Sequence, residues 1–125
     1  MSKLRKRIFA FRCAGVGIYR FFHDETHPKI HLFATVCVIA AGAFFGVSPL
    51  EWCLLLICIG GVLMGEAVNS AVEKLADRIT REHDPLIGAA KDIAAGAVLM
   101  FVCAAVAVGL IIFIPKIVSF FSSVA

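Results

Sequence analysis

The most restrictive feature of this sequence is residues 93–114, which contain twenty-two consecutive residues without a charged side chain. An α-helix needs about 20 apolar residues to cross the hydrocarbon of a bilayer, so this segment is long enough to span a membrane. Residues 30–47 form another apolar segment, in which His31 is the strongly polar exception. Residues 52–64 form a third, which spans only if its helix continues through Glu66.

The overall composition agrees with a membrane protein. Of the 125 residues, 61% are hydrophobic and 17% are charged, whereas a soluble domain has about 25% charged residues. A chain of this size has too little interior to hide the excess of apolar side chains from water. The net charge of +3 is too small to indicate a nucleic-acid partner. We therefore expect one all-α integral membrane domain comprising residues 1–125.

Local signals mark the start of the second expected transmembrane helix, over residues 49–80. Ser48, Pro49 and Glu51 form a capping box with a proline in the first helical turn. No further proline follows before residue 80, so the predicted helix is roughly 45–50 Å long. It therefore crosses the hydrocarbon and extends into water.

The other two transmembrane helices are expected over residues 29–47 and 85–114. Pro28 precedes the first, where a proline is tolerated in the opening turn. Asp84 and Pro85 repeat the combination of a cap residue and a proline. Pro115 is predicted to end the third helix, because proline lacks the backbone N–H that continues a helix.

Residues 1–24 are predicted to form an amphipathic helix on the bilayer surface. Their apolar side chains fall within about 40° of one line at about 100° per residue, and most basic side chains lie away from that line. Such helices lie in the membrane interface with their apolar face down. A soluble arm with chance periodicity is the alternative. The apolar positions are Leu4, Ile8, Phe11, Gly15, Ile18 and Phe22.

The distribution of Lys and Arg predicts the orientation. Seven precede residue 30, none lies in residues 48–51, and four lie in residues 74–91. Because cytoplasmic loops are enriched in Lys and Arg, the N-terminus and the second connection should be cytoplasmic. The first loop and the C-terminus should then lie outside, although Lys116 opposes this weakly.

A polar stripe begins where the apolar part of the second span ends. It consists of Glu66, Asn69, Glu73 and Asp77. The offsets of three, seven and eleven residues place all four within about 80° of one another on a helix. Carboxylates near hydrocarbon are costly, so they are candidates for a functional site. Helix–helix contact through polar side chains is the alternative interpretation.

Polar residues of the other spans should reach the same depth. They are Glu25, His27 and His31 before or within the first span, and Lys91 and Asp92 at the start of the third. Several carboxylates beside one lysine favour a hard cation such as Mg²⁺, which suits phosphate chemistry. A three-span chain has little surface to enclose a nucleotide. An oligomer with sites between subunits is therefore expected.

Two other classes of function remain open on these grounds. A small proton-coupled exporter could use an intramembrane glutamate as a proton relay. Such a carboxylate is expected in the middle of an apolar segment, whereas Glu66 lies at the end of one. A non-catalytic assembly subunit is the second rival, and it would need neither Mg²⁺ nor ATP.

Two segments, GEAVNSAVEKLADRI (65–79) and HDPLIGAAKDIAAGAVL (83–99), resemble the prokaryotic diacylglycerol kinase family, which includes the undecaprenol kinases. The family pattern E-x-x-N-[ST]-[AS]-[IV]-E-x-x-x-D is matched over residues 66–77, and its A-K-D segment over residues 90–92. Glu25 matches the acid before the first span. Residues 29–31 and 109–117 look like the polyprenol branch. The similarity extends over about residues 11–117.

The resemblance implies a homotrimeric bundle at the bacterial plasma membrane, with an N-terminal surface helix and three spans per subunit. Members of that family transfer the γ-phosphoryl group of Mg-ATP to a lipid hydroxyl at the cytoplasmic face. Undecaprenol is the acceptor we expect, with diacylglycerol as the alternative. By position, Glu66 resembles the catalytic base, and Glu25 and Glu73 resemble metal ligands. The residues that resemble the nucleotide site are Lys6, Asn69, Asp77, Lys91 and Asp92.

Overall fold

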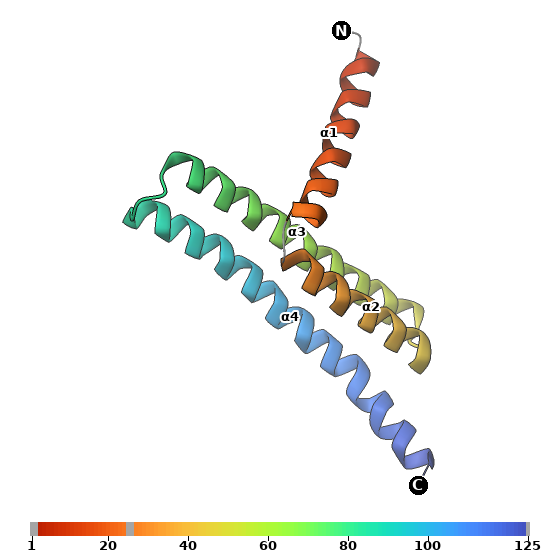
Figure 1. Cartoon of the computed structure of the whole chain (residues 1–125). Coiled ribbons are helices and arrows are strands. Elements are labelled where there is room, and N and C mark those ends of the chain that lie inside the picture. Colours follow the sequence, from red (N-terminus) through yellow and green to blue (C-terminus); the bar gives the residue numbers. More distant parts are fainter. Residues whose placement is uncertain (1–2, 25–26, 125) are drawn as a thin grey trace.

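The structure, a computed structural model, describes residues 3–24 and 27–124 and contains four helices in that part of the chain (Figure 1). Three of them, α2 to α4, are long and apolar enough to cross a membrane. The predicted all-α architecture with three spans is therefore confirmed. The helices are α1 (Lys3–Asp24), α2 (His27–Phe45), α3 (Pro49–Ile79) and α4 (Pro85–Val124).

The predicted capping box begins α3. The Ser48 backbone N–H donates to Glu51 Oε2 at 2.7 Å, and the Glu51 N–H donates to Ser48 Oγ at 3.2 Å. The helix then runs without interruption for 31 residues to Ile79, where Thr80 follows as the C-cap. Its length is roughly 45 Å at 1.5 Å per residue. The apolar segment and the polar stripe thus belong to one continuous helix.

The start of α4 also follows the prediction. Asp84 Oδ1 accepts hydrogen bonds from the backbone N–H groups of Leu86 and Ile87, at 2.9 and 3.1 Å. These bonds satisfy two of the donors that the first helical turn leaves without an intrahelical partner. Because α3 ends a few residues earlier, the short connection folds α4 back along it.

The prediction that Pro115 ends the third span is wrong. Pro115 lies inside α4, which continues to Val124. A proline removes one backbone hydrogen bond, but a helix among other helices can continue through it when neighbouring contacts hold both halves. Here Lys116 Nζ forms an ion pair with Glu51 at 3.1 Å, and the Phe120 ring packs edge-on against Phe45. These contacts tie the final turns to α2 and α3.

The bundle is built around the antiparallel pair α3 and α4, with α2 beside them (Figure 1). Leu55, Val47 and Ile112 form a small buried cluster. Glycines allow closer approach elsewhere: a Cβ atom on Gly61 would collide with the Phe101 ring of α4. Small residues at helix contacts are typical of membrane bundles, because they let backbones come close.

Large apolar side chains cover much of the remaining surface, including Phe33, Ile57 and Ile111, each at least 65% exposed. A face of this kind is stable against lipid or against another subunit, and both fit a membrane protein. The helix α1 points away from the three-helix bundle (Figure 1) and has no buried residues. Its predicted position on the bilayer surface and the predicted trimer stay predictions.

Candidate functional site

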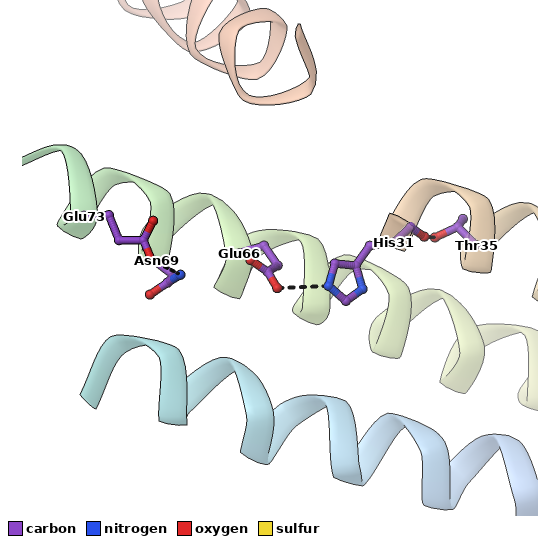
Figure 2. A network of polar contacts seen from close by, with 5 residues as sticks. All are labelled: His31, Thr35, Glu66, Asn69 and Glu73. Carbon is purple, nitrogen blue, oxygen red and sulfur yellow. Dashed lines mark hydrogen bonds and ion pairs between the residues drawn. The ribbon is translucent and has the colours of Figure 1, made fainter. Parts of the chain in front are cut away.

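The polar stripe on α3 changes from buried to exposed along the helix. The Glu66 side chain is 11% exposed and that of Asp77 is 53% exposed, while Asn69 and Glu73 are half-buried between them. Figure 2 shows Glu66, Asn69 and Glu73 succeeding one another along the helix. The stripe therefore leads from the apolar interior towards solvent, as its position after the apolar segment predicted.

The buried end of the stripe is bonded to α2. His31 Nε2 lies 2.9 Å from Glu66 Oε1 (Figure 2). An ionised carboxylate only accepts hydrogen bonds, so in that state the Nε2–H of His31 is the donor. A buried carboxylate needs such a partner, because losing its hydration without compensation is costly. This contact fixes Glu66 between two helices.

An apolar cavity of about 230 Å³ lies next to this pair, between α2, α3 and α4. His31 lines its end nearest the stripe, while Val62, Ala105 and Phe113 are among its apolar walls. His31 therefore shares the lining of this cavity with side chains that are almost all apolar. The polar partner of the ring is on the other helix, at Glu66.

Asn69 and Glu73 form the middle of the stripe. Asn69 Nδ2 donates to Glu73 Oε1 at 3.4 Å, a long hydrogen bond. Asn69 Oδ1 is buried and has no hydrogen-bond partner among the described residues. A buried amide oxygen without a partner is costly and marks a place where a donor or a cation can bind. Together with the Glu73 carboxylate it offers oxygen ligands of the type that Mg²⁺ prefers.

The described residues alone supply only part of a metal site. No group of three or more His, Cys, Asp or Glu side chains within residues 3–24 and 27–124 is close enough to hold an ion. Glu25, the other predicted ligand, lies outside the described residues. Mg²⁺ is usually held by one or two carboxylates, with phosphate oxygens and waters as further ligands. The oxygens of Glu73 and Asn69 fit that pattern.

The exposed end of the stripe contacts α4. Lys91 Nζ donates to Asp77 Oδ1 at 3.0 Å. Asp92, the next residue, is exposed. Lys6 is also exposed and lies on α1, and no hydrogen bond or ion pair joins it to the stripe in the part of the chain that the structure describes. The structure therefore places the four predicted residues of α3 one after another along that helix and joins Lys91 to the last of them. It shows no hydrogen bond or ion pair from Asp92 or Lys6 to the stripe within the described residues.

Sequence reasoning assigned no role to His31, although it noted the residue at the depth of the stripe. Two signals could have drawn attention to it. His31 is a lone ionisable side chain within an apolar span, and such residues face the bundle interior and pair with one another. The expected partner would then have been Glu66, the carboxylate nearest the hydrocarbon on the next helix.

Comparison with known proteins decides the family. A profile described as prokaryotic diacylglycerol kinase matches residues 12–113, which is most of the chain. The chain belongs to the prokaryotic diacylglycerol kinase family. It is therefore a member of a family of membrane lipid kinases, in agreement with the resemblance seen in its motifs. The transporter and the assembly subunit are set aside by this membership.

The relatives of this chain carry two different enzyme names. The chain is 37% identical over 116 residues to an undecaprenol kinase of Bacillus subtilis (strain 168), covering 93% of this chain and 94% of that protein. It is 32% identical over 113 residues to a diacylglycerol kinase of Synechocystis, covering 90% of this chain and 65% of that protein. A diacylglycerol kinase of Escherichia coli (strain K12) is 33% identical over 73 residues, or 58% of this chain and 60% of its own length.

Proposed function

We propose that this member of the family is an ATP- and Mg²⁺-dependent kinase that phosphorylates the hydroxyl of a membrane lipid alcohol, with undecaprenol as the acceptor. The supporting observation is the position of Glu66. It is a buried carboxylate at the end of an apolar segment, where a lipid hydroxyl arriving from the bilayer meets groups arriving from water. Diacylglycerol is the alternative acceptor.

Glu66 acts as the general base in this proposal. One of its carboxylate oxygens accepts the proton of the lipid hydroxyl while the hydroxyl oxygen bonds to the γ-phosphorus of ATP. The bond from that phosphorus to the β,γ-bridging oxygen breaks, and ADP leaves. The proton stays on Glu66 until it is released to solvent through the exposed end of the polar stripe. A base of this kind typically contributes about 10²–10⁴-fold to the rate.

The middle and exposed parts of the stripe bind the nucleotide and its metal. Glu73 and Glu25 are the proposed carboxylate ligands of Mg²⁺, and Asn69, whose Oδ1 is buried without a partner among the described residues, is proposed to contact the nucleotide beside them. When bound, Mg²⁺ supplies charge neutralisation to the phosphate oxygens, which is the main requirement of phosphoryl transfer. The remaining proposed nucleotide contacts are Asp77, Lys91, Asp92 and Lys6.

Lys91 neutralises charge on the transferring phosphate. In the structure its ammonium group pairs with Asp77. Phosphate oxygens bring more negative charge than one exposed carboxylate, so the flexible lysine side chain can exchange partners or contact both. Asp77 then keeps Lys91 near the site when the nucleotide is absent.

Undecaprenol is preferred as the acceptor because the undecaprenol kinase of Bacillus subtilis aligns over 93% of the chain and 94% of its own length at 37% identity. The diacylglycerol kinase of Synechocystis has 32% identity and extends beyond the aligned region. Apolar walls discriminate poorly between hydrocarbon tails, so the residues of the site do not by themselves distinguish the two acceptors.

We propose further that the enzyme is a homotrimer in the bacterial plasma membrane, with sites between subunits and the N-terminus in the cytoplasm. The large exposed apolar surface of the single chain supports an assembly. The Lys and Arg distribution supports the orientation.

The test is a phosphorylation assay on the purified protein in mixed detergent–lipid micelles with labelled ATP. Undecaprenol and diacylglycerol are offered separately at equal mole fraction. The proposal expects label on undecaprenol at a kcat/KM at least about tenfold higher, dependent on Mg²⁺. Preference for diacylglycerol would contradict undecaprenol as the acceptor but would support the lipid kinase activity. Label on neither lipid would reject the proposal.

A further inference from the structure

The hydrogen bond between His31 and Glu66 joins two residues that are 35 positions apart in the chain. Both side chains are largely withdrawn from solvent, at 24% and 11% exposure. Figure 2 shows the ring of His31 reaching from α2 to the carboxylate on α3. Withdrawing two ionisable side chains from water into an apolar bundle costs free energy. Because one of the two is the proposed base, the contact needs an explanation.

The geometry affects what the carboxylate can do. His31 engages Oε1 of Glu66, and no hydrogen bond to Oε2 occurs among the described residues. One oxygen is therefore held by His31, and the other has no hydrogen-bond partner in the described part of the chain. A glutamate has three side-chain torsions, and a buried hydrogen bond at its end selects one arrangement of them. The free oxygen then has a fixed direction relative to α3.

We infer that His31 is a positioning residue for Glu66: it holds one carboxylate oxygen so that the other is directed at the acceptor hydroxyl. This inference rests on the proposed function, in which Glu66 is the base. His31 itself touches neither the phosphate nor the hydroxyl in this account. Its contribution is to orient Glu66. Loss of the correct orientation of a reacting group can lower the rate by about 100-fold.

A purely structural role for the pair is the competing explanation. Polar contacts between membrane helices contribute modestly to stability, and a contact of that kind would stabilise the bundle without influencing the reaction. The two explanations differ in what a substitution changes. Loss of positioning lowers kcat and acts only through Glu66, whereas loss of helix contact lowers stability and is independent of the chemistry at Glu66.

Two substitutions separate the hydrogen bond from the shape of the side chain. In His31→Gln, the amide nitrogen can occupy the place of Nε2 and still donate to Glu66. In His31→Asn, the side chain is one carbon shorter, so its amide nitrogen falls short of Glu66. Both variants carry a polar amide side chain, so the free energy of burying it is similar in the two. Neither variant places an apolar side chain next to the Glu66 carboxylate.

Thr35 provides a matched control on the same helix. Its Oγ1 donates to the backbone carbonyl of His31 at 2.8 Å, one turn away, and it also lines the cavity. Thr35→Val keeps the branched shape and removes this hydroxyl without changing the ring contact to Glu66. We expect its kcat to stay within about twofold of the wild type, because no group that contacts Glu66 is altered.

The experiment measures kcat, KM for Mg-ATP, KM for the lipid and the melting temperature of each purified variant. We expect His31→Asn to lower kcat by about 10-fold to 100-fold with KM for Mg-ATP within about twofold, and His31→Gln to retain most of the rate. In a Glu66→Gln background, His31→Asn should cause no further loss, because residues that act as a unit are not additive.

Three outcomes would overturn the inference. These are equal kcat for His31→Gln and His31→Asn, a lower melting temperature with unchanged kcat, and a full additional loss in the Glu66→Gln background. Failure of the underlying function gives a different pattern. In that case the wild type labels neither lipid, or Glu66→Gln alone keeps the wild-type rate.

Discussion

Lys91 and Asp77 join the start of α4 to the exposed end of the polar stripe, with 3.0 Å between Lys91 Nζ and Asp77 Oδ1. The two residues are fourteen positions apart and lie on either side of the connection between α3 and α4. Both belong to the proposed nucleotide site. The pair therefore holds a cation next to the place where ATP phosphates are expected.

Lys91→Gln should raise the KM for Mg-ATP by about 10-fold to 100-fold, the effect expected from losing a hydrogen bond between charged groups. The melting temperature should change little, because the Lys91–Asp77 pair is exposed and such pairs contribute little to stability. Steady-state kinetics with varied ATP measure the effect. Lys116→Gln is the control. Lys116 also lies on α4, but near the opposite end of that helix from Lys91, where it pairs with Glu51. An equal KM in both variants would remove Lys91 from the nucleotide site.

Glu73→Gln should raise the Mg²⁺ concentration needed for half-maximal rate, because it removes the charge of a proposed metal ligand and keeps its shape. Glu25→Gln should have the same effect. Titration of Mg²⁺ against rate at saturating ATP gives the measurement. Glu51→Gln, at the opposite end of α3, should leave the requirement unchanged. If the titrations of Glu73→Gln and Glu25→Gln both match the wild type, neither residue is a ligand.

The close approach of α3 and α4 predicts a difference between adjacent glycines. A Cβ atom on Gly61 would collide with the Phe101 ring, whereas one on Gly60 would have open space within this chain. Gly61→Val should therefore lower stability by about 1–3 kcal/mol, the usual cost of overpacking. Gly60→Val has the same helix propensity and serves as the control.

The measurement for the two glycines is thermal unfolding in detergent. Adding Phe101→Ala to Gly61→Val should recover part of the loss, because it vacates the space that the new side chain needs. Equal melting temperatures for the two valine variants would contradict the packing seen between α3 and α4.

The Lys and Arg distribution predicts that the N-terminus is cytoplasmic and the C-terminus is outside. A reporter that functions only in the cytoplasm should be active at the N-terminus and inactive after residue 125. A reporter that needs an oxidising compartment should give the reverse result. Activity of the cytoplasmic reporter at the C-terminus would contradict the predicted orientation.

Local chemistry made much of the fold predictable. Ser48 and Glu51 form the cap that their spacing indicated, and Asp84 begins the last helix. The polar stripe was also predictable, because the helical repeat alone places Glu66 and Asp77 on one face. These features depend on residues a few positions apart, which a sequence displays directly.

Features that depend on contacts between distant residues were not predictable in the same way. Pro115 was expected to end a helix, but the ion pair from Lys116 to Glu51 and the aromatic contacts of Phe120 hold the helix beyond it. The contact of His31 with Glu66 was missed because the sequence gives the depth of each residue and not the direction in which it points across the bundle.

The rate of phosphoryl transfer by Glu66→Gln, relative to the wild type on the same lipid, tests the central claim most directly. Gln keeps an oxygen that can accept from His31, so the bundle should fold and bind Mg-ATP, while the side chain can no longer take a proton. We predict a rate lower by about 10²–10⁴-fold with ATP affinity and melting temperature close to those of the wild type. A variant that retains more than about a tenth of the wild-type rate, against that expected range, would show that Glu66 is not the base.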